Sequence, residues 1–266
     1  MTPVDVAQGD GPIVLGLPHT GTHVPDDIKA RLNARGLGLT DTDWHIDRLY
    51  DSLLPGATTV RAAFHRYVID ANRDPSGASL YPGQNTTGLV PLTDFDGHDI
   101  WETPPSEAEI EDRRAAFHAP YHAALTAELS RVRKRHGVAI LYDCHSIRGD
   151  IPFLFDGTLP DFNIGTNSGT TCDRRIEAAT WEICAQATGY TRILNGRFKG
   201  GWTTRHYGQP QSGIHAIQME LAQSTYLAQE TAPWSYDEGK AARLRVHLKT
   251  ILTKLAALAP TLKGAS

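Results

Sequence analysis

The chain has 266 residues, of which 40% are hydrophobic and 21% are charged, and its formal net charge is -4. This composition is typical of a soluble globular protein with enough length for a sizeable core. The small negative charge provides no basic surface for nucleic acid, so a nucleic-acid partner is not expected.

The sequence shows neither a secretory signal nor an apolar run long enough to span a bilayer, so we expect a cytoplasmic protein without a membrane partner. Cys144, Cys172 and Cys184 lack CxxC spacing, which argues against a disulfide framework and predicts reduced thiols. No linker or internal repeat divides the chain, so a single domain over residues 1–266 is predicted. No coiled-coil repeat indicates an oligomeric state.

Strand and helix patterns alternate in the first third of the chain. A buried strand is expected within residues 11–18, followed by a helix from about Pro25 to Gly36. A second helix, capped by Thr40 or Thr42, is expected to carry the apolar residues up to Leu53. Two strands, at residues 58–61 and 67–70, are expected to follow.

Residues 71–105 are rich in Gly, Pro, Asn and Asp, which predicts a long functional loop. A disordered insertion is the alternative. The tyrosine, tryptophan and leucines of this segment favour a loop that is anchored to the protein.

The longest helix is predicted to begin at Ser106, where Glu109 completes a capping-box pattern, and to end at His136-Gly137. Pro120 should kink or divide this helix. His118 and His122 lie four residues apart around the proline. Such spacing also occurs in metal sites, but the glutamate of HExxH is absent, so packing or local hydrogen bonding is favoured for the pair.

The second half of the chain continues the alternation. It contains a strand at 138–143, a helix at 173–186, a short strand at 191–194, a glycine-rich loop, a strand at 214–221 and a helix at 236–258. This order predicts an α/β fold with helices on both faces of a sheet. No GxGxxG, Walker or GxSxG motif appears, which excludes the commonest dinucleotide, nucleotide and serine-hydrolase sites.

Two histidines stand just past predicted buried strands. His19 follows the first strand and His145 follows the strand at 138–143, so both are expected at the carboxyl edge of the sheet, where one metal ion could bind them. A hydrolytic zinc site needs about three protein ligands and an open position for water. Asp43, Asp47 and His23 are candidates for the third ligand. Asp43 is preferred because it opens a helix soon after the first strand, although a helix cap or an outer hydrogen bond would also explain it.

Other residues near these strand ends suit hydrolysis of an anionic substrate. Glu220 is an isolated acid in an apolar strand, which indicates either a general base or a buried ion pair. Arg73 can bind a carboxylate bidentately and Asn72 can add an amide hydrogen bond. Arg61 and Arg66 are further candidates for substrate contacts, or they are surface charges.

The cysteine that precedes His145 is not expected to be a nucleophile. Cys144 lies between Asp143 and His145, and neighbouring residues of a strand point to opposite faces. A buried cysteine is usually a small hydrophobic residue.

Most of the chain resembles the N-formylglutamate amidohydrolase family. The resemblance is carried by the segments PHTGTHVP, TDTDWHIDRLYD, FHRYVIDANRDPSG, LYPGQNTTGLVP, APYH, LYDCHSIRG and GTNSGTTCD. It implies hydrolysis of N-formyl-L-glutamate to formate and L-glutamate in histidine degradation, with Zn²⁺ or another divalent ion as cofactor.

The DANR, DCHS and MEL segments also resemble zinc carboxypeptidases. That resemblance implies a three-layer sandwich with a mixed, mostly parallel sheet, substrate-carboxylate binding by Asn72 and Arg73, zinc binding by His145, and a general base at Glu220. The chain departs from the HxxE motif of those peptidases because it reads His19-Thr20-Gly21-Thr22. A carboxylate ligand is therefore expected from elsewhere.

Two questions stay open at the level of sequence. The second substrate carboxylate could be bound by Arg61, Arg66, Arg148 or the polar loop at 165–171. The alternative functions are a zinc deacylase of another N-acyl amino acid, a carboxypeptidase-like peptidase, or a non-catalytic binding protein for acidic metabolites.

Overall fold

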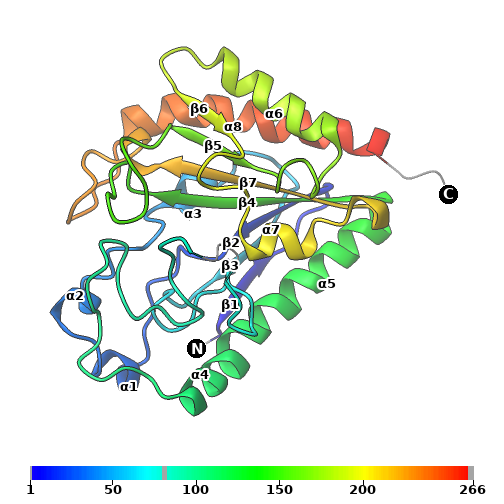
Figure 1. The fold of residues 1–266 in the computed structure, drawn as a ribbon. Coiled ribbons are helices and arrows are strands. Elements are labelled where there is room, and N and C mark those ends of the chain that lie inside the picture. Colours follow the sequence, from blue (N-terminus) through cyan, green and yellow to red (C-terminus); the bar gives the residue numbers. More distant parts are fainter. Residues whose placement is uncertain (1, 80–82, 263–266) are drawn as a thin grey trace.

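A seven-stranded mixed sheet forms the centre of the protein (Figure 1). The computed structural model describes residues 2–79 and 83–262. In sheet order the strands are β1 (Val4–Ala7), β3 (Thr58–Ala62), β2 (Ile13–Leu17), β4 (Ala139–Ile147), β7 (Ile214–Ala222), β5 (Phe162–Gly165) and β6 (Arg192–Leu194). Strands β3, β2, β4 and β7 run parallel, whereas β1 is antiparallel to β3 and β5 to β7. The predicted mixed, mostly parallel sheet is confirmed.

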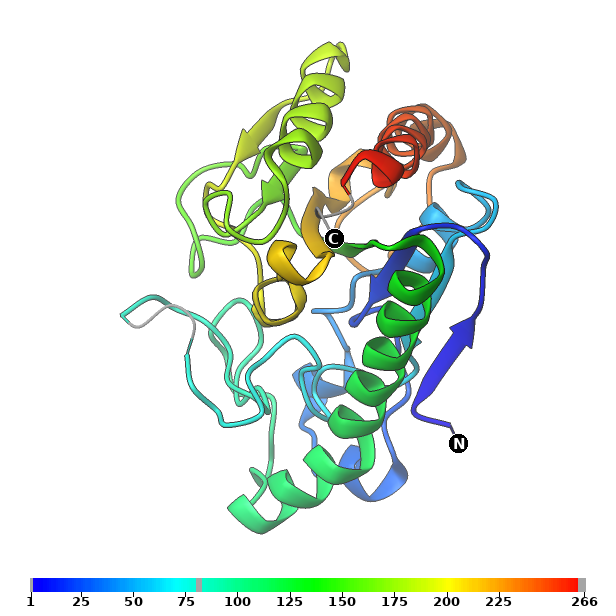
Figure 2. The ribbon, with the colours of Figure 1, turned by 90° about the vertical axis from the view of Figure 1, so that its right-hand side faces the viewer.

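Helices cover both faces of this sheet, as predicted. Figures 1 and 2 show α6 (Arg174–Gln186) and α8 (Glu238–Leu258) on one face and α5 (Ala119–His136) on the other. The first face also carries α3 (Ile46–Tyr50). The buried side chains on this face of the sheet form one apolar cluster. The side chains of α5 contribute to a second cluster on the opposite face. The result is a three-layer α/β arrangement.

Strand β4 contributes side chains to the apolar clusters on both faces of the sheet. All nine of its residues are buried, and successive side chains point to opposite faces. Tyr142 and Cys144 belong to the cluster under α8, whereas Leu141 belongs to the cluster under α5. Asp143 and His145 share the α5 side with Leu141 by the same alternation. The expectation that Cys144 faces away from these two residues is therefore confirmed.

The long helical run begins with the predicted capping box. The Ser106 hydroxyl accepts from the amide of Glu109, and the Glu109 carboxylate accepts from the amide of Ser106. The run consists of α4 (Glu107–Arg113), a π-helical turn at Arg114–His118 and α5. The proline ring at position 120 would clash with the carbonyl four residues earlier in a regular α-helix, so the wider turn just before it has a physical cause. Gly137 ends α5 with a φ of 77°.

Three expectations for the first third of the chain are wrong in detail. The helix expected from Pro25 to Gly36 is two short helices, α1 (Asp26–Lys29) and α2 (Ala34–Leu37). The helix expected from residues 40–42 starts only at Ile46, because His45 adopts a left-handed conformation with a φ of 59°. Residues 66–68 form a turn and residues 69–70 have no regular secondary structure, so the expected strand is not formed. Their apolar side chains are buried under neighbouring loops, which imitates the burial of a strand.

The segment from Ala71 to Pro105 contains no helix or named strand among its described residues, in line with the loop prediction. Trp101 is buried and anchors the segment, whereas Leu92 is exposed. Leu80, Tyr81 and Pro82 lie outside the described residues. Among the strands and α-helices, three elements were not predicted: strands β1 and β5 and the short helix α7 (Trp202–Tyr207), which follows the glycine-rich loop. In the described part of the chain, no helix has an apolar stretch long enough to cross a bilayer.

Candidate metal centre and substrate pocket

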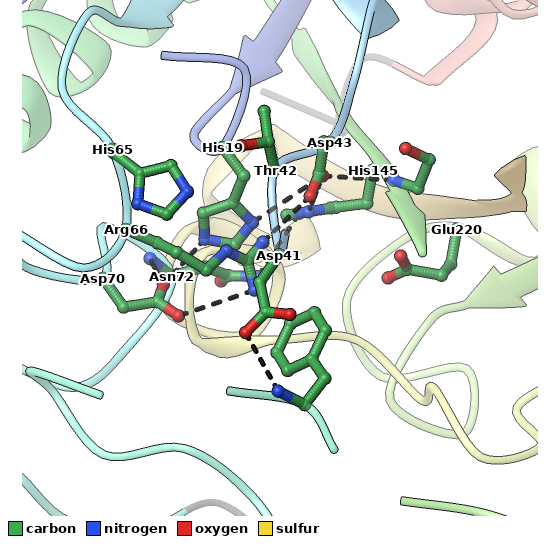
Figure 3. Close-up of polar contacts among 12 residues, drawn as sticks. His19, Asp41, Thr42, Asp43, His65, Arg66, Asp70, Asn72, His145 and Glu220 are labelled. Atoms are coloured by element: carbon green, nitrogen blue, oxygen red, sulfur yellow. Dashed lines mark hydrogen bonds and ion pairs between the residues drawn. The ribbon is translucent and has the colours of Figure 1, made fainter. Parts of the chain in front are cut away.

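Three buried side chains meet near the carboxyl ends of the central strands. His19 follows β2, His145 lies near the end of β4, and Asp43 lies between β2 and α3. One ligand atom of each residue can be chosen so that all three atoms lie within 4.8 Å of one another. The Asp43 Oδ2 atom lies 3.3 Å from His145 Nδ1 and 3.7 Å from His19 Nδ1 (Figure 3). Two imidazole nitrogens and one carboxylate oxygen therefore face a common point.

The backbone explains why Asp43 reaches this point. Its amide donates to the carbonyl of His19 at 3.1 Å, which fastens the segment after β2 to its own strand end. The Oδ2 atom accepts from the amide of Ser146 at 3.1 Å, and the Oδ1 atom accepts from Arg66 at 2.9 Å. Although burial acts in the opposite direction, Arg66 and His19 hold the pKa of Asp43 below its ordinary value. The residue is thus an ionised carboxylate in the fold.

Each histidine is oriented by a second carboxylate. His19 Nε2 lies 2.7 Å from Asp70 Oδ1, and His145 Nε2 lies 3.1 Å from Asp143 Oδ1. Because a carboxylate only accepts, the contacts with Asp70 and Asp143 place a proton on each Nε2 atom. Each Nδ1 atom faces the Asp43 carboxylate, where a bound metal ion would take the place of a proton. The Nδ1 atom of His19 is buried and has no hydrogen-bond partner. A metal-binding histidine typically has its other nitrogen held by a carboxylate in this way, so the donor set fits a divalent ion.

The other two candidates for the third ligand lie outside this group. The Asp47 side chain is 44% exposed and lies 3.6 Å from Arg61 Nη1. His23 is engaged through its backbone, which bonds to the segment after β3. Among the described residues, Asp43 is the carboxylate that shares the point with both histidines.

A cavity of about 300 Å³ opens beside this cluster. Its lining includes His19, His145, Asn72, Arg73, Arg66 and Glu220, which lie far apart in the sequence. The strand ends and loops that were expected to converge therefore do so. The lining also contains Phe95, Leu154, Arg197 and Phe198, which the sequence did not indicate as site residues.

Glu220 lies on β7 directly opposite His145 of β4. Its carboxylate is directed toward the histidine and aspartate cluster in Figure 3. Burial raises the pKa of Glu220 to about 7, and the neighbouring His145 acts in the opposite direction. Gln218 Nε2 donates to Glu220 Oε2 at 2.9 Å and fixes the orientation of the carboxylate. A carboxyl group that titrates near neutral pH is able to take up and release a proton.

Asn72 and Arg73 line the cavity from a turn that also contains Asp70. The Asn72 Oδ1 atom accepts from the amide of Thr203 at 2.8 Å, and its Nδ2 atom lies 3.3 Å from His145 Nε2. The Arg73 guanidinium donates to the carbonyl and hydroxyl oxygens of Thr87 at 2.9 and 2.8 Å. The predicted functional loop thus contributes Thr87, which holds the Arg73 side chain in place beside the cavity.

The remaining arginines differ in their surroundings. Arg66 is buried and lines the cavity, where it donates to Asp43 and lies 3.9 Å from Asp70. Arg61 pairs with Asp5 on the neighbouring strand β1. It is not among the described residues that line this cavity. Arg148 donates to Asp96. Neither Arg148 nor the loop at 165–171 is among the described residues that line the cavity.

The surroundings of Cys144 differ from those of a reactive cysteine. The Cys144 thiol is fully buried in the core, and burial raises its pKa well above the ordinary value, which argues against a nucleophile.

His118 and His122 bond to backbone carbonyls and do not belong to the metal-binding group found among the described residues. The predicted role in packing or local hydrogen bonding agrees with these contacts.

No role is predicted from the sequence for Asp70, Asp143 or Gln218. A usable signal was present, because a carboxylate next to a candidate metal histidine at a strand end often orients that histidine. Asp143 lies two residues before His145 on the same face of β4, which alternation alone could have indicated.

Comparisons with known proteins identify the family of the chain. Residues 11–227 match the sequence profile of the family described as N-formylglutamate amidohydrolase. Over 253 residues, the chain is 46% identical to the N-formylglutamate deformylase of Pseudomonas putida and 45% identical to that of Pseudomonas aeruginosa, with 94% of each chain covered.

Two solved structures share the fold. The crystal structure of N-formylglutamate amidohydrolase from Ralstonia eutropha JMP134 superposes with a TM-score of 0.80 at 26% identity, covering 98% of this chain and 99% of that one. A gene product from Agrobacterium tumefaciens gives a TM-score of 0.73 at 20% identity, with coverage of 97% and 96%. The match to the family profile and the sequence identity over 94% of the chain show that the chain belongs to the N-formylglutamate amidohydrolase family.

Proposed function

We propose that this protein is a metal-dependent amidohydrolase that cleaves N-formyl-L-glutamate to formate and L-glutamate. The observation that carries the proposal is the position of His19, Asp43 and His145 beside a cavity that also contains a base and arginines. The activity named for the two Pseudomonas relatives supports the choice of substrate.

In this proposal the Nδ1 atoms of His19 and His145 and the Oδ2 atom of Asp43 hold one divalent ion, with Zn²⁺ as the favoured metal. Two nitrogens and one carboxylate oxygen form a ligand set that is common in hydrolytic zinc sites. A bound zinc ion polarises a substrate carbonyl and lowers the pKa of a coordinated water to roughly 7. Asp70 and Asp143 keep the two imidazole rings in the orientation that this binding needs.

Glu220 serves as the general base of the reaction. It accepts a proton from the attacking water as the new carbon–oxygen bond forms at the formyl carbon. It then delivers that proton to the amide nitrogen as the carbon–nitrogen bond breaks, so that formate and the free amine of L-glutamate leave. Its buried position and its hydrogen bond from Gln218 keep the carboxylate aimed at the cluster.

The glutamate part of the substrate carries two carboxylates and needs cationic partners. Arg73 with Asn72 binds one of them, because a guanidinium presents two parallel N–H donors to a carboxylate. Arg66 lines the same cavity and is proposed for the second carboxylate, although it also pairs with Asp43 and Asp70. A cytoplasmic location and a place in histidine degradation remain predictions from the sequence and the family resemblance.

The substrate is tested with a panel of N-acyl amino acids on the zinc-loaded protein. N-formyl-L-glutamate, N-acetyl-L-glutamate, N-succinyl-L-glutamate and N-formyl-L-leucine separate the acyl group from the side chain. We expect kcat/KM to be highest for N-formyl-L-glutamate, by at least about tenfold over each of the others. A higher kcat/KM for the acetyl or succinyl substrate would identify a different N-acyl deacylase. Binding of acidic ligands without any turnover would indicate a binding protein.

A further inference from the structure

The long helix presents two histidines to the loop at the cavity. His118 ends the π-helical turn, and His122 follows one turn later in α5, so both rings lie on one side of the helix with their centroids 4.4 Å apart. Extra-wide turns of this kind are frequent at functional sites. The π-turn and Pro120 therefore set the direction in which both histidines point.

Each histidine bonds to a backbone carbonyl of the turn that carries Asn72. His122 Nε2 lies 2.8 Å from the carbonyl oxygen of Ala71, and His118 Nε2 lies 3.0 Å from that of Arg73. Because a carbonyl oxygen only accepts, the Nε2 atom of each ring is the protonated one. The two bonds hold the residues immediately before and after Asn72.

The short turn held in this way contains three residues of the proposed site. Asp70 bonds to His19, Asn72 lies against His145, and Arg73 lines the cavity. Figure 2 shows this cyan part of the loop near α5 and α7. A shift of the two carbonyls would move a metal-orienting carboxylate and a substrate-binding arginine together.

Helix α7 fixes the second histidine from the other side. The Tyr207 hydroxyl lies 3.0 Å from His122 Nδ1, and the Trp202 ring packs edge-on against the His122 ring with centroids 4.7 Å apart. Burial lowers the pKa of His122 to about 3, so the ring is neutral and its Nδ1 atom accepts from Tyr207. His122 thereby has one defined position.

We propose that His118 and His122 are positioning residues that set the geometry of Asp70, Asn72 and Arg73 through the carbonyls of Ala71 and Arg73. This inference rests on the proposed function, because its consequence is read in catalysis. His118 acts on the carbonyl of Arg73 itself and should affect substrate-carboxylate binding. His122 acts between Asp70 and Asn72 and should affect the metal-side geometry, and hence kcat.

The test replaces each histidine with two residues of similar length. Glutamine places an N–H donor near the position of Nε2, whereas methionine fills the space without a donor. His118→Gln, His118→Met, His122→Gln and His122→Met are compared by kcat and KM on the zinc-loaded protein. His136→Met is the matched control, because His136 lies at the far end of α5 and bonds to the carbonyl of Asp10, away from the cavity.

We expect His118→Met to raise KM at least tenfold, and His122→Met to lower kcat at least tenfold, with each glutamine variant within about threefold of wild type. The His136→Met control should match wild type. Equal losses for glutamine and methionine at a position, in step with a fall in Tm, would show a purely structural role and overturn the proposal. Unchanged kinetics in both methionine variants would overturn it as well.

A second measurement is independent of activity. Long-range ¹H–¹⁵N NMR spectra of the wild type report which ring nitrogen of each histidine carries the proton. We expect neutral Nε2–H tautomers for His118 and His122. If the wild type shows these tautomers but has no formyl-glutamate turnover, the proposed function fails while the contacts stand. Nδ1–H tautomers would contradict the hydrogen bonds on which the positioning role depends.

Discussion

At the scale of single residues, Glu220 carries the most specific chemistry in the pocket. Its carboxyl is buried on a strand whose other side chains are mostly apolar, and it receives one hydrogen bond from Gln218. Burial of this kind is costly for an ionised group unless the group has a task or a partner. His145, which lies opposite, provides the partner, and the proposed general-base role provides the task.

Replacement of Glu220 by glutamine removes the proton acceptor and keeps the size of the side chain. We expect kcat of Glu220→Gln to fall by a factor of about 10² to 10⁴, which is the usual contribution of a general base. Zinc content, measured by atomic absorption, should stay the same because Glu220 is not among the three proposed ligands. Full activity in this variant would assign the base to another residue.

The residues of the site differ in how far the sequence could place them. His19, His145 and Glu220 follow or lie in apolar strands, so the period of the strand was enough to locate them. Asp43 lies in an irregular segment, where no periodicity exists, and its position depends on backbone bonds to His19 and Ser146. Contacts between segments so distant in sequence are set by tertiary packing, which is why the sequence alone does not separate Asp43 from Asp47 and His23.

At the scale of elements, helix α7 packs against β7 and begins next to Gly201, which lines the pocket. The amide of Gly201, at the start of the helix, donates to Gln218 Oε1 at 2.6 Å, and the amide of Thr203 donates to Asn72. A Cβ atom at Gly201 would lie 2.2 Å from the Asn72 Nδ2 atom. An alanine at this position would therefore force the Asn72 amide to shift.

The substitution Gly201→Ala should displace the Asn72 amide from its position beside His145. The backbone φ of -74° tolerates alanine, so we expect the fold to persist and kcat/KM to fall at least tenfold. Gly239→Ala is the control, because a Cβ there meets only ordinary contacts on the exposed start of α8. Equal kcat/KM values for Gly201→Ala and wild type would show that the Asn72 amide has no part in catalysis.

The elements that the sequence missed are short or locally ambiguous. Helix α7 has six residues, two of them threonines, and its formation depends on contacts with β7 and the Asn72 turn. Strand β5 has four residues and is held by pairing with β7 and β6. The run at 67–70 has the apolar pattern of a strand, yet its residues are buried without forming one. Local propensity is a weak guide where tertiary contacts decide the conformation.

At the scale of the whole molecule, the layered fold was predictable because long elements carry clear periodicity. Strands β4 and β7 and helices α5, α6 and α8 have the expected positions within a few residues. The order of strands in the sheet was not predicted, because pairing between β7 and β5 joins segments about 50 residues apart by contacts that leave no local signal. The prediction of a single domain over residues 1–266 stays a prediction.

Buried neutral histidines make the fold sensitive to acid. Burial lowers the pKa of His122 to about 3, whereas the unfolded chain has a value near 6.5. Below about pH 6.5 the unfolded state binds more protons than the folded state at this site, so stability falls as the pH drops from about 6.5 to about 3. Above pH 6.5 this residue contributes no pH dependence.

The substitution His122→Gln removes that proton site while keeping a donor. We expect the free energy of unfolding of His122→Gln, measured by urea denaturation between pH 7 and pH 4, to decline less steeply than that of wild type. Parallel pH profiles for the two proteins would show that the His122 ring is able to take up a proton in the folded state.

The central claim is that His19, Asp43 and His145 hold a metal ion that is required for deformylation. Formate release from N-formyl-L-glutamate is measured on the purified protein, after chelation, and after Zn²⁺ is restored, with Asp43→Asn treated in parallel. We predict that chelation abolishes release, that Zn²⁺ restores it in the wild type, and that Zn²⁺ does not restore it in Asp43→Asn. Undiminished release from chelated protein with no bound metal would contradict the account, and so would the absence of formate from zinc-loaded, folded protein.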